Sequence, residues 1–135
     1  MRLLNANDVR YLLVGGYAVA YHGYPRYTND IDLWVDADRA NAEKVLRTIS
    51  DFGFPVDERL RAWAPNPQKI LRIGEPPLRI EIMTTIAGVS FADAYDRRID
   101  DRLDGVDVRV IGLDDLKANK AAAGRHKDLD DLEHL

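Results

Sequence analysis

The segment 28-TNDIDLW-34 places two aspartates, Asp30 and Asp32, on either side of one isoleucine and directly before an apolar run. Side chains two residues apart in a strand point to the same face of the sheet. The two carboxylates are therefore expected on one face, with Ile31 and Leu33 on the other. Because neighbouring carboxylates repel each other, the pair either faces water as a solvated strand edge or holds a cation.

Apolar periodicity, interrupted by glycine and proline, indicates alternating strands and helices along the chain. We expect strands over residues 11–14, 30–35, 69–74, 78–84 and 105–112. We expect helices over residues 17–23, 39–52 (capped by Asp38), 91–99, 113–124 and 127–135, and a loop over residues 62–68. A Gly-Glu-Pro-Pro turn makes the third and fourth strands a hairpin or close neighbours. The pattern predicts a single α+β (mixed α/β) domain spanning residues 1–135, with one mixed sheet flanked by helices.

The composition excludes several kinds of site. The 135 residues include no cysteine, which rules out disulfides, thiolate metal sites and a cysteine nucleophile. The three histidines are scattered and show no zinc-site spacing. The net charge of −4 argues against a broad nucleic-acid-binding face but leaves room for a local basic groove. We find no apolar run long enough for a membrane span and no signal peptide, so we expect a soluble, cytoplasmic protein.

A third acid follows on the later strand segment 78-LRIEIMT-84. Arg79, Glu81 and Met83 share one face of that strand. If it lies beside Asp30 and Asp32, Glu81 completes a three-carboxylate cluster suited to one or two Mg²⁺ or Mn²⁺ ions. The alternative is that Glu81 forms a cross-strand salt bridge with an arginine.

The pair Gly15-Gly16 lies between the first expected strand and the first expected helix. Backbone N–H groups of such a turn can approach a phosphate at a helix N-terminus. A tight turn or close packing explains two glycines equally well. The surrounding residues match neither a Walker-type P-loop nor a dinucleotide-binding motif.

The stretch 14-VGGYAVAYHGYPRYTNDIDLWV-35, taken with Glu81, resembles the signature of the nucleotidyltransferase superfamily, which has the DNA polymerase β-like fold. That signature is a glycine turn, a short helix, an acid-x-acid pair on a strand and a third acid on a later strand. The similarity is closest to small bacterial stand-alone members related to abortive-infection nucleotidyltransferase toxins. In those proteins an arginine precedes T-x-D-x-D and a Lys…Gly-Arg-x-Lys-Asp-x-x-Asp segment lies near the C-terminus. Here Arg26 precedes TNDID, and 119-NKAAAGRHKDLDDLEHL-135 supplies the second segment.

The resemblance implies a role for each matching residue. The metal ligands would be Asp30, Asp32 and Glu81, with Glu81 on the second metal or acting as general base. The triphosphate of the bound nucleotide would contact the backbone of Gly15 and Gly16. It would also contact the side chains of Arg26, Lys120, Arg125 and Lys127. The catalytic set would comprise Asp30, Asp32, Glu81, Lys120 and Asp128.

The activity that the resemblance implies is transfer of a nucleoside monophosphate from an NTP to an acceptor hydroxyl, with Mg²⁺ or Mn²⁺ as cofactor. The acceptor would be an RNA such as tRNA, a protein or a small molecule, and a toxin-type member would have a cognate partner protein. Tyr17 stands where relatives often have serine, and Glu81 where they often have aspartate. These departures keep open a degenerate, antitoxin-like domain that binds a nucleotide or a partner. A metal-dependent phosphohydrolase fits the glycine turn less well.

Other polar and aromatic residues have two interpretations. Arg26 would contact a phosphate or pair with Asp30 or Asp32. His22 would be a catalytic base or, more simply, a packed residue at a helix end. Trp63 would stack on a base or pack against the surface. The remaining C-terminal acids, Asp130, Asp131 and Glu133, are expected to be solvated or capping charges.

Overall fold

A six-stranded mixed sheet organises the computed structural model, which describes residues 1–63, 70–75 and 77–135. The strand order is β3-β4-β2-β1-β6-β5. The β1–β6 and β2–β4 pairs are parallel, and the β1–β2, β3–β4 and β5–β6 pairs are antiparallel. The strands are β1 (Tyr11–Val14), β2 (Asp30–Val35), β3 (Leu71–Glu75), β4 (Leu78–Met83), β5 (Ile99–Leu103) and β6 (Val106–Val110).

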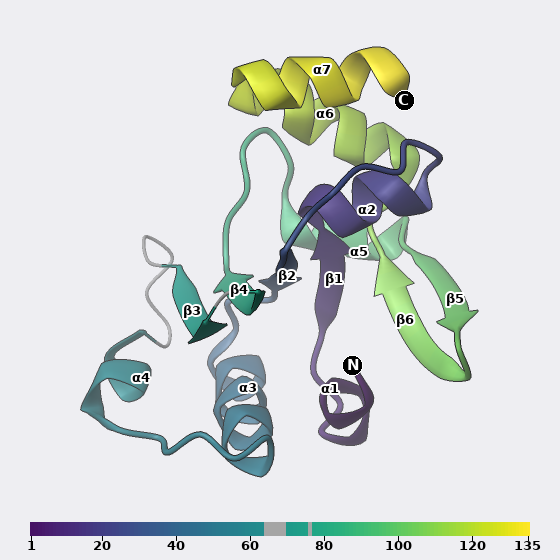
Figure 1. The fold of residues 1–135 in the computed structure, drawn as a ribbon. Coiled ribbons are helices and arrows are strands. Elements are labelled where there is room, and N and C mark those ends of the chain that lie inside the picture. Colours follow the sequence, from purple (N-terminus) through teal and green to yellow (C-terminus); the bar gives the residue numbers. More distant parts are fainter. Residues whose placement is uncertain (64–69, 76) are drawn as a thin grey trace.

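Helices flank the sheet, as the sequence pattern predicted. They are α1 (Arg2–Ala6), α2 (Gly15–Tyr21), α3 (Arg39–Asp51), α4 (Glu58–Trp63), α5 (Phe91–Asp96), α6 (Leu113–Ala123) and α7 (His126–His134). In Figure 1, α6 and α7 lie together at one end of the molecule, while α1, α3 and α4 lie toward the other, and α2 lies beside β1 and β2. The mixed α/β architecture is therefore confirmed.

One hydrophobic core fixes the strand that carries the two aspartates. All four residues of β1 are buried, and Leu33, Trp34 and Val35 of β2 are buried beside them. The Trp34 indole donates a hydrogen bond to the carbonyl of Thr84 at 3.1 Å. The apolar half of β2 is thus held rigidly, which orients the polar half that begins at Asp30.

The predicted elements are present, with some differences. Asp38 caps α3 by accepting a hydrogen bond from the Asn41 amide at 3.4 Å, and β3 and β4 form the expected antiparallel pair. The helix predicted over residues 91–99 ends at Asp96, and the exposed, charged edge strand β5 follows it. Helices α1 and α4 were not predicted. The loop predicted over residues 62–68 is wrong at its start, which belongs to α4, and its remainder lies outside the described residues.

No helix in the described ranges is long and apolar enough to cross a membrane.

Candidate active site

Three acidic side chains belong to two adjacent parallel strands. In the β2–β4 register Asp32 lies opposite Glu81, and Asp30 lies opposite Arg79. Glu81 therefore lies beside the aspartate pair, as expected, while its role as a metal ligand stays a prediction. The parallel pairing produces this position, because residues in register point to the same face of the sheet.

Of these three acids, Asp32 is the one that forms no ion pair with any described residue. Its Oδ1 atom is buried and has no hydrogen-bond partner among the described residues. Burial, together with the negative charges of Glu81 and Asp30, raises the pKa of Asp32 to about 6, and the positive charge of Lys127 acts in the opposite direction. An unpartnered carboxylate oxygen in a field of other carboxylates is what a divalent cation would satisfy.

Arginines neutralise the other two acids. Arg79 donates hydrogen bonds from Nε and Nη2 to the two oxygens of Asp30, each at 3.2 Å. Its Nη2 also lies 3.6 Å from Glu81 Oε1, and Arg72 Nε reaches the same oxygen at 3.1 Å. The cross-strand salt bridge considered for Glu81 is thus present.

These ion pairs bear on metal binding. In the described ranges, no three acidic or histidine side chains are grouped so as to hold a metal ion in this conformation. The donor set of Asp32 and Glu81 has the oxygen chemistry that Mg²⁺ and Mn²⁺ prefer. Asp30 joins that set only if Arg79 releases it.

The glycine turn packs directly against Asp32. Val14, the last residue of β1, lies opposite Asp32 in the antiparallel register, so Gly15 follows immediately beside the carboxylate. Gly15 has φ +67°, and a Cβ atom there would collide with Asp32 Oδ2. A Cβ on Gly16 would lie 2.8 Å from Thr28. Close packing therefore requires both glycines, and their contact with phosphate remains a prediction.

Replacing Gly15 with alanine tests this packing. We expect Gly15→Ala to lower the free energy of unfolding by about 2–4 kcal/mol, because left-handed strain and a collision with Asp32 act together. Gly105→Ala is the matched control, since Gly105 has φ +77° but open space around it, and should cost about 1–2 kcal/mol. Urea denaturation measures both. Equal losses would contradict the close packing on Asp32.

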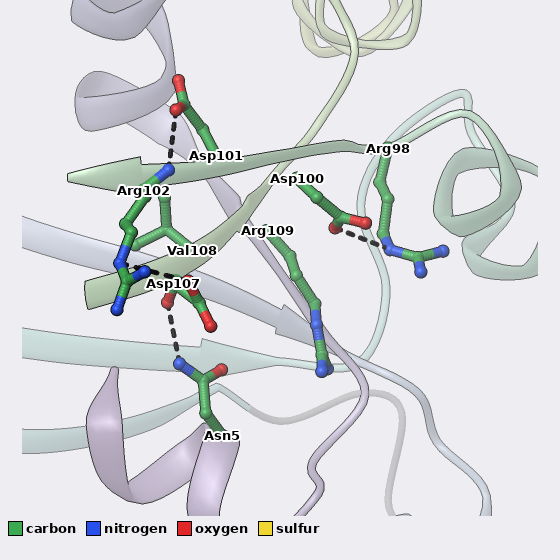
Figure 2. Close-up of a pocket in the computed structure, with 8 residues that line it drawn as sticks. All are labelled: Asn5, Arg98, Asp100, Asp101, Arg102, Asp107, Val108 and Arg109. Carbon is green, nitrogen blue, oxygen red and sulfur yellow. Dashed lines mark hydrogen bonds and ion pairs between the residues drawn. The ribbon is translucent and has the colours of Figure 1, made fainter. Parts of the chain in front are cut away.

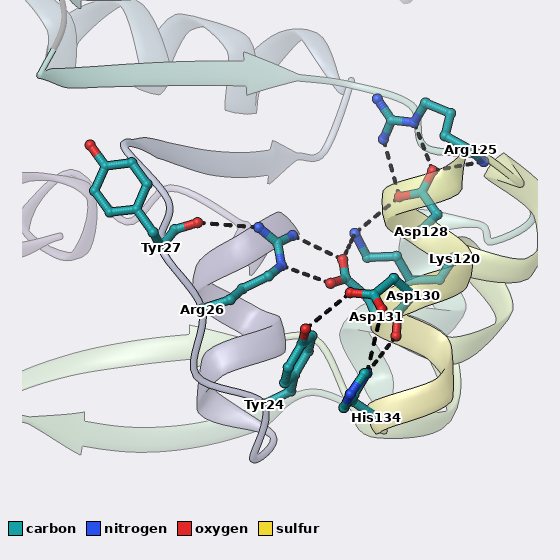
Figure 3. A network of polar contacts seen from close by, with 9 residues as sticks. All are labelled: Tyr24, Arg26, Tyr27, Lys120, Arg125, Asp128, Asp130, Asp131 and His134. Atoms are coloured by element: carbon teal, nitrogen blue, oxygen red, sulfur yellow. Dashed lines mark hydrogen bonds and ion pairs between the residues drawn. The ribbon is translucent and has the colours of Figure 1, made fainter.

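Lys120 and Arg125 belong to a second cluster, the α6–α7 network, together with Asp128, Asp131 and Arg26 (Figure 3). Lys120 is buried and its Nζ lies 3.2 Å from Asp128 Oδ1 and 3.1 Å from Asp131 Oδ2. Arg125 donates to Asp128 at 2.7 Å, and Arg26 donates to both oxygens of Asp131 at 2.7 and 2.9 Å. The family resemblance implied phosphate contacts for Lys120 and Arg125, and for Arg26 either a phosphate contact or an ion pair; here each of the three is paired with an aspartate.

Two interpretations of this region were wrong. Arg26 pairs with Asp131 and not with Asp30 or Asp32. Asp131 is not a solvated charge, since only 1% of its side chain is exposed. Hydrogen bonds from Arg26 and Lys120 outweigh the effect of burial and hold the pKa of Asp131 below its ordinary value. This network fastens α7 to the loop that leads into β2.

The start of α7 adds positive charge near Asp32. The charge of Lys127 lowers the pKa of Asp32, and the charge of Asp32 contributes to the raised pKa of Arg125. Both residues therefore lie within electrostatic range of the acidic site. They remain the candidates for phosphate contacts among the C-terminal cations.

Other predicted residues have structural contacts. His22 lies at the C-terminus of α2, with Nε2 2.7 Å from the carbonyl oxygen of Ile111, which favours its role as a packed helix-end residue. Trp63 is 3% exposed, so stacking of a base on it is excluded in this conformation. Sequence reasoning gave Arg79 no role, although its position two residues before Glu81 placed it on the same face.

The surface depression shown in Figure 2 lies apart from the three acids on β2 and β4. It is lined by α1, β5 and β6, whereas the acids lie on β2 and β4 across β1 in the sheet. Four of its charged residues form two ion pairs, Arg98–Asp100 at 3.0 Å and Arg102–Asp107 at 3.7 Å. Asp101 accepts a hydrogen bond from the Tyr21 hydroxyl, and Arg109 donates one to the carbonyl of Val9. Each of its acids therefore already has a partner within the protein, unlike Asp32 Oδ1.

Comparisons with known proteins agree with the fold. No curated protein matches the chain. A crystal structure from Thermotoga maritima, described as that of a "putative nucleotidyltransferase (TM1012)", is similar over 97% of this chain and 84% of its own, with a TM-score of 0.63 and 20% identity. The whole chain, residues 1–135, matches the family described as "Nucleotidyltransferase of unknown function (DUF6036)". With its glycine turn beside an acidic pair on a mixed sheet, the chain belongs to this nucleotidyltransferase family.

Proposed function

We propose that the protein is a metal-dependent nucleotidyltransferase that transfers a nucleoside monophosphate from an NTP to an acceptor hydroxyl. Membership of the nucleotidyltransferase family supports the reaction class. The observation that carries the proposal is Asp32, which is partly buried, lies in register with Glu81, has an unpartnered oxygen and is packed against the Gly15 turn.

In the proposed reaction the acceptor oxygen forms a bond to the α-phosphorus, the bond from that phosphorus to the bridging oxygen breaks, and pyrophosphate leaves. Asp32 and Glu81 would hold Mg²⁺ or Mn²⁺, joined by Asp30 after it separates from Arg79. A bound cation would lower the pKa of the acceptor hydroxyl and neutralise charge on the phosphates. Glu81 or solvent would take the hydroxyl proton.

The backbone beside the acids suits a triphosphate. Gly15 and Gly16 begin α2, so their N–H groups have no carbonyl partner within the helix. Lys127 and Arg125 at the start of α7 add positive charge near Asp32. These groups would bind and orient the anionic nucleotide while the acids face its reacting phosphorus.

A second candidate is a non-catalytic nucleotide- or partner-binding domain, as in an antitoxin-like role. The observation that favours it is the neutralisation of Asp30 and Glu81 by Arg79 and Arg72. In a working catalyst these ion pairs must open when the cation arrives, and in a degenerate domain they would stay closed.

A labelling experiment separates the two candidates. The purified protein is incubated with each α-³²P-labelled NTP, Mg²⁺ or Mn²⁺, and fractions of cellular RNA, protein and small molecules. We expect label on one fraction together with pyrophosphate release, and neither with the Asp30→Ala/Asp32→Ala variant. Label on tRNA or on a protein would also identify the acceptor and support a toxin-type role. Absence of transfer, combined with nucleotide binding that the double substitution does not change, would contradict the catalytic proposal.

A further inference from the structure

Arg79 is the cation that lies among the three acids. It is placed there by the β2–β4 register, which sets it opposite Asp30, and by its position two residues before Glu81. Its guanidinium makes a fork of two hydrogen bonds to Asp30 at 3.2 Å and lies 3.6 Å from Glu81. One side chain thus bridges two of the three carboxylates that the proposed function assigns to a divalent cation.

Arg79 and a metal would compete for the same atoms. Both Asp30 oxygens accept from Arg79, and its Nη2 faces the Glu81 oxygen that also accepts from Arg72. A carboxylate that directly ligates a divalent cation turns its lone pairs toward the metal, and two adjacent cations repel each other. The closed ion pairs and an occupied metal site therefore exclude each other at Asp30.

We propose that Arg79 is a displaceable latch, which neutralises Asp30 and Glu81 in the metal-free protein and leaves Asp30 when a divalent cation binds. This inference rests on the proposed function. Arg79 is then a positioning residue that sets the cation affinity of the acidic site and keeps it folded without metal. The released guanidinium stays beside the site as a forked donor for the phosphates of the nucleotide.

Solvent exposure makes the latch weak enough to open. The Arg79 side chain is 33% exposed and that of Asp30 is 26% exposed, so water and salt screen their attraction. An exposed ion pair of this kind contributes little to stability, so a divalent cation can displace it. The Lys120 pairs differ, since their side chains are 5% or less exposed and they have no comparable access to solvent.

Manganese binding to the nucleotide-free protein tests the latch. Isothermal titration with Mn²⁺ is carried out on the wild type and on Arg79→Gln. We expect Arg79→Gln to bind Mn²⁺ about 5- to 10-fold more tightly, which corresponds to removal of a competitor worth about 1 kcal/mol. It should also melt at a lower temperature than the wild type in EDTA and gain more from added Mn²⁺. Unchanged or weaker Mn²⁺ binding by Arg79→Gln would overturn the inference.

Two further variants separate the latch from a general effect of charge. Arg72→Gln removes one positive charge beside Glu81 and leaves the Asp30 ion pair intact. The affinity of this variant for Mn²⁺ should rise by about twofold or less, because the Arg72 side chain is 56% exposed and its ion pair is weak. Arg79→Lys keeps the charge but loses the fork, so it should bind Mn²⁺ more tightly than the wild type. Equal tightening in Arg79→Gln and Arg72→Gln, with Arg79→Lys unchanged, would show a charge effect and overturn the latch.

Asp32→Asn distinguishes failure of the latch from failure of the proposed function. If Asp32→Asn weakens Mn²⁺ binding but Arg79→Gln fails to strengthen it, the latch is wrong and the metal site stands. If Asp32→Asn leaves Mn²⁺ binding unchanged, the metal does not bind at these acids, and both the latch and the proposed metal site are wrong.

Discussion

Lys120→Met is expected to lower the free energy of unfolding by about 3–5 kcal/mol, the usual cost of removing one partner from a buried ion pair. The ammonium group lies between Asp128 and Asp131, and no more than 1% of either aspartate side chain is exposed. Methionine fills the space but leaves two carboxylates buried with less compensation. Urea denaturation at pH 7 measures the loss.

A surface pair provides the control. Lys44 and Asp8 lie 3.6 Å apart, with side chains 40% and 85% exposed, so Lys44→Met should cost about 1 kcal/mol or less. If Lys120→Met costs no more than Lys44→Met, the α6–α7 network does not hold the C-terminal helix, and the roles of Arg26 and Lys120 would have to be reassigned to ligand binding.

The loss should depend on pH. Burial raises the pKa of Asp128, but hydrogen bonds from Arg125 and Lys120 outweigh it and hold that pKa below its ordinary value; Asp131 behaves in the same way. Carboxyls with a depressed folded pKa stabilise the protein above their unfolded pKa of about 3.9, and this stability is lost as the pH falls below it. The difference between wild type and Lys120→Met should therefore shrink below about pH 4.

Asp32→Asn should have the opposite effect on stability while it abolishes transfer. At pH 7 the metal-free wild type holds a charged, partly buried carboxylate beside Glu81 and Asp30. Asparagine removes that charge and offers an N–H donor to Glu81. We expect a gain of about 1–2 kcal/mol in the free energy of unfolding, less than the pKa shift alone implies because solvent reaches part of the group. Label transfer should fall by about 10²-fold or more.

The direction of the pH dependence follows from the raised pKa. Asp32 has a folded pKa of about 6, above the reference value of 3.8, so its proton is retained in the folded state to a higher pH. The wild type therefore loses stability as the pH rises from about 4 to about 6, and the advantage of Asp32→Asn grows over the same range. Glu43→Gln, on the exposed face of α3, should show no such change. A variant less stable than the wild type at pH 7, or an advantage independent of pH, would contradict this account of Asp32.

The acidic site could be predicted in large part from local patterns. Alternation in 28-TNDIDLW-34 places Asp30 and Asp32 on one face, and alternation in 78-LRIEIMT-84 places Arg79 with Glu81. The parallel pairing of β2 with β4 could not be predicted, because no local turn connects the strands. The partner of Arg79 depends on that register, so its pairing with Asp30 emerges only in the folded sheet.

The buried charges of the C-terminal helix α7 could not be predicted from the sequence pattern. Apolar periodicity favours leucine on the buried face, yet Leu129 is 47% exposed while Asp128 and Asp131 are buried. The buried cation Lys120 reverses the usual preference, since it compensates two carboxylates at once. Such a network comes from α6, α7 and the loop before β2, and no single segment encodes it. The edge strand β5 was missed for a related reason, since its charged residues lack alternation.

A crystal structure with Mn²⁺ and a non-hydrolysable NTP tests the central claim most directly. We predict an anomalous manganese peak at bonding distance from the carboxylates of Asp32 and Glu81, the triphosphate on the N–H groups of Gly15 and Gly16, and Arg79 withdrawn from Asp30. Manganese and nucleotide bound away from these strands, with the Arg79–Asp30 pair still closed, would contradict it.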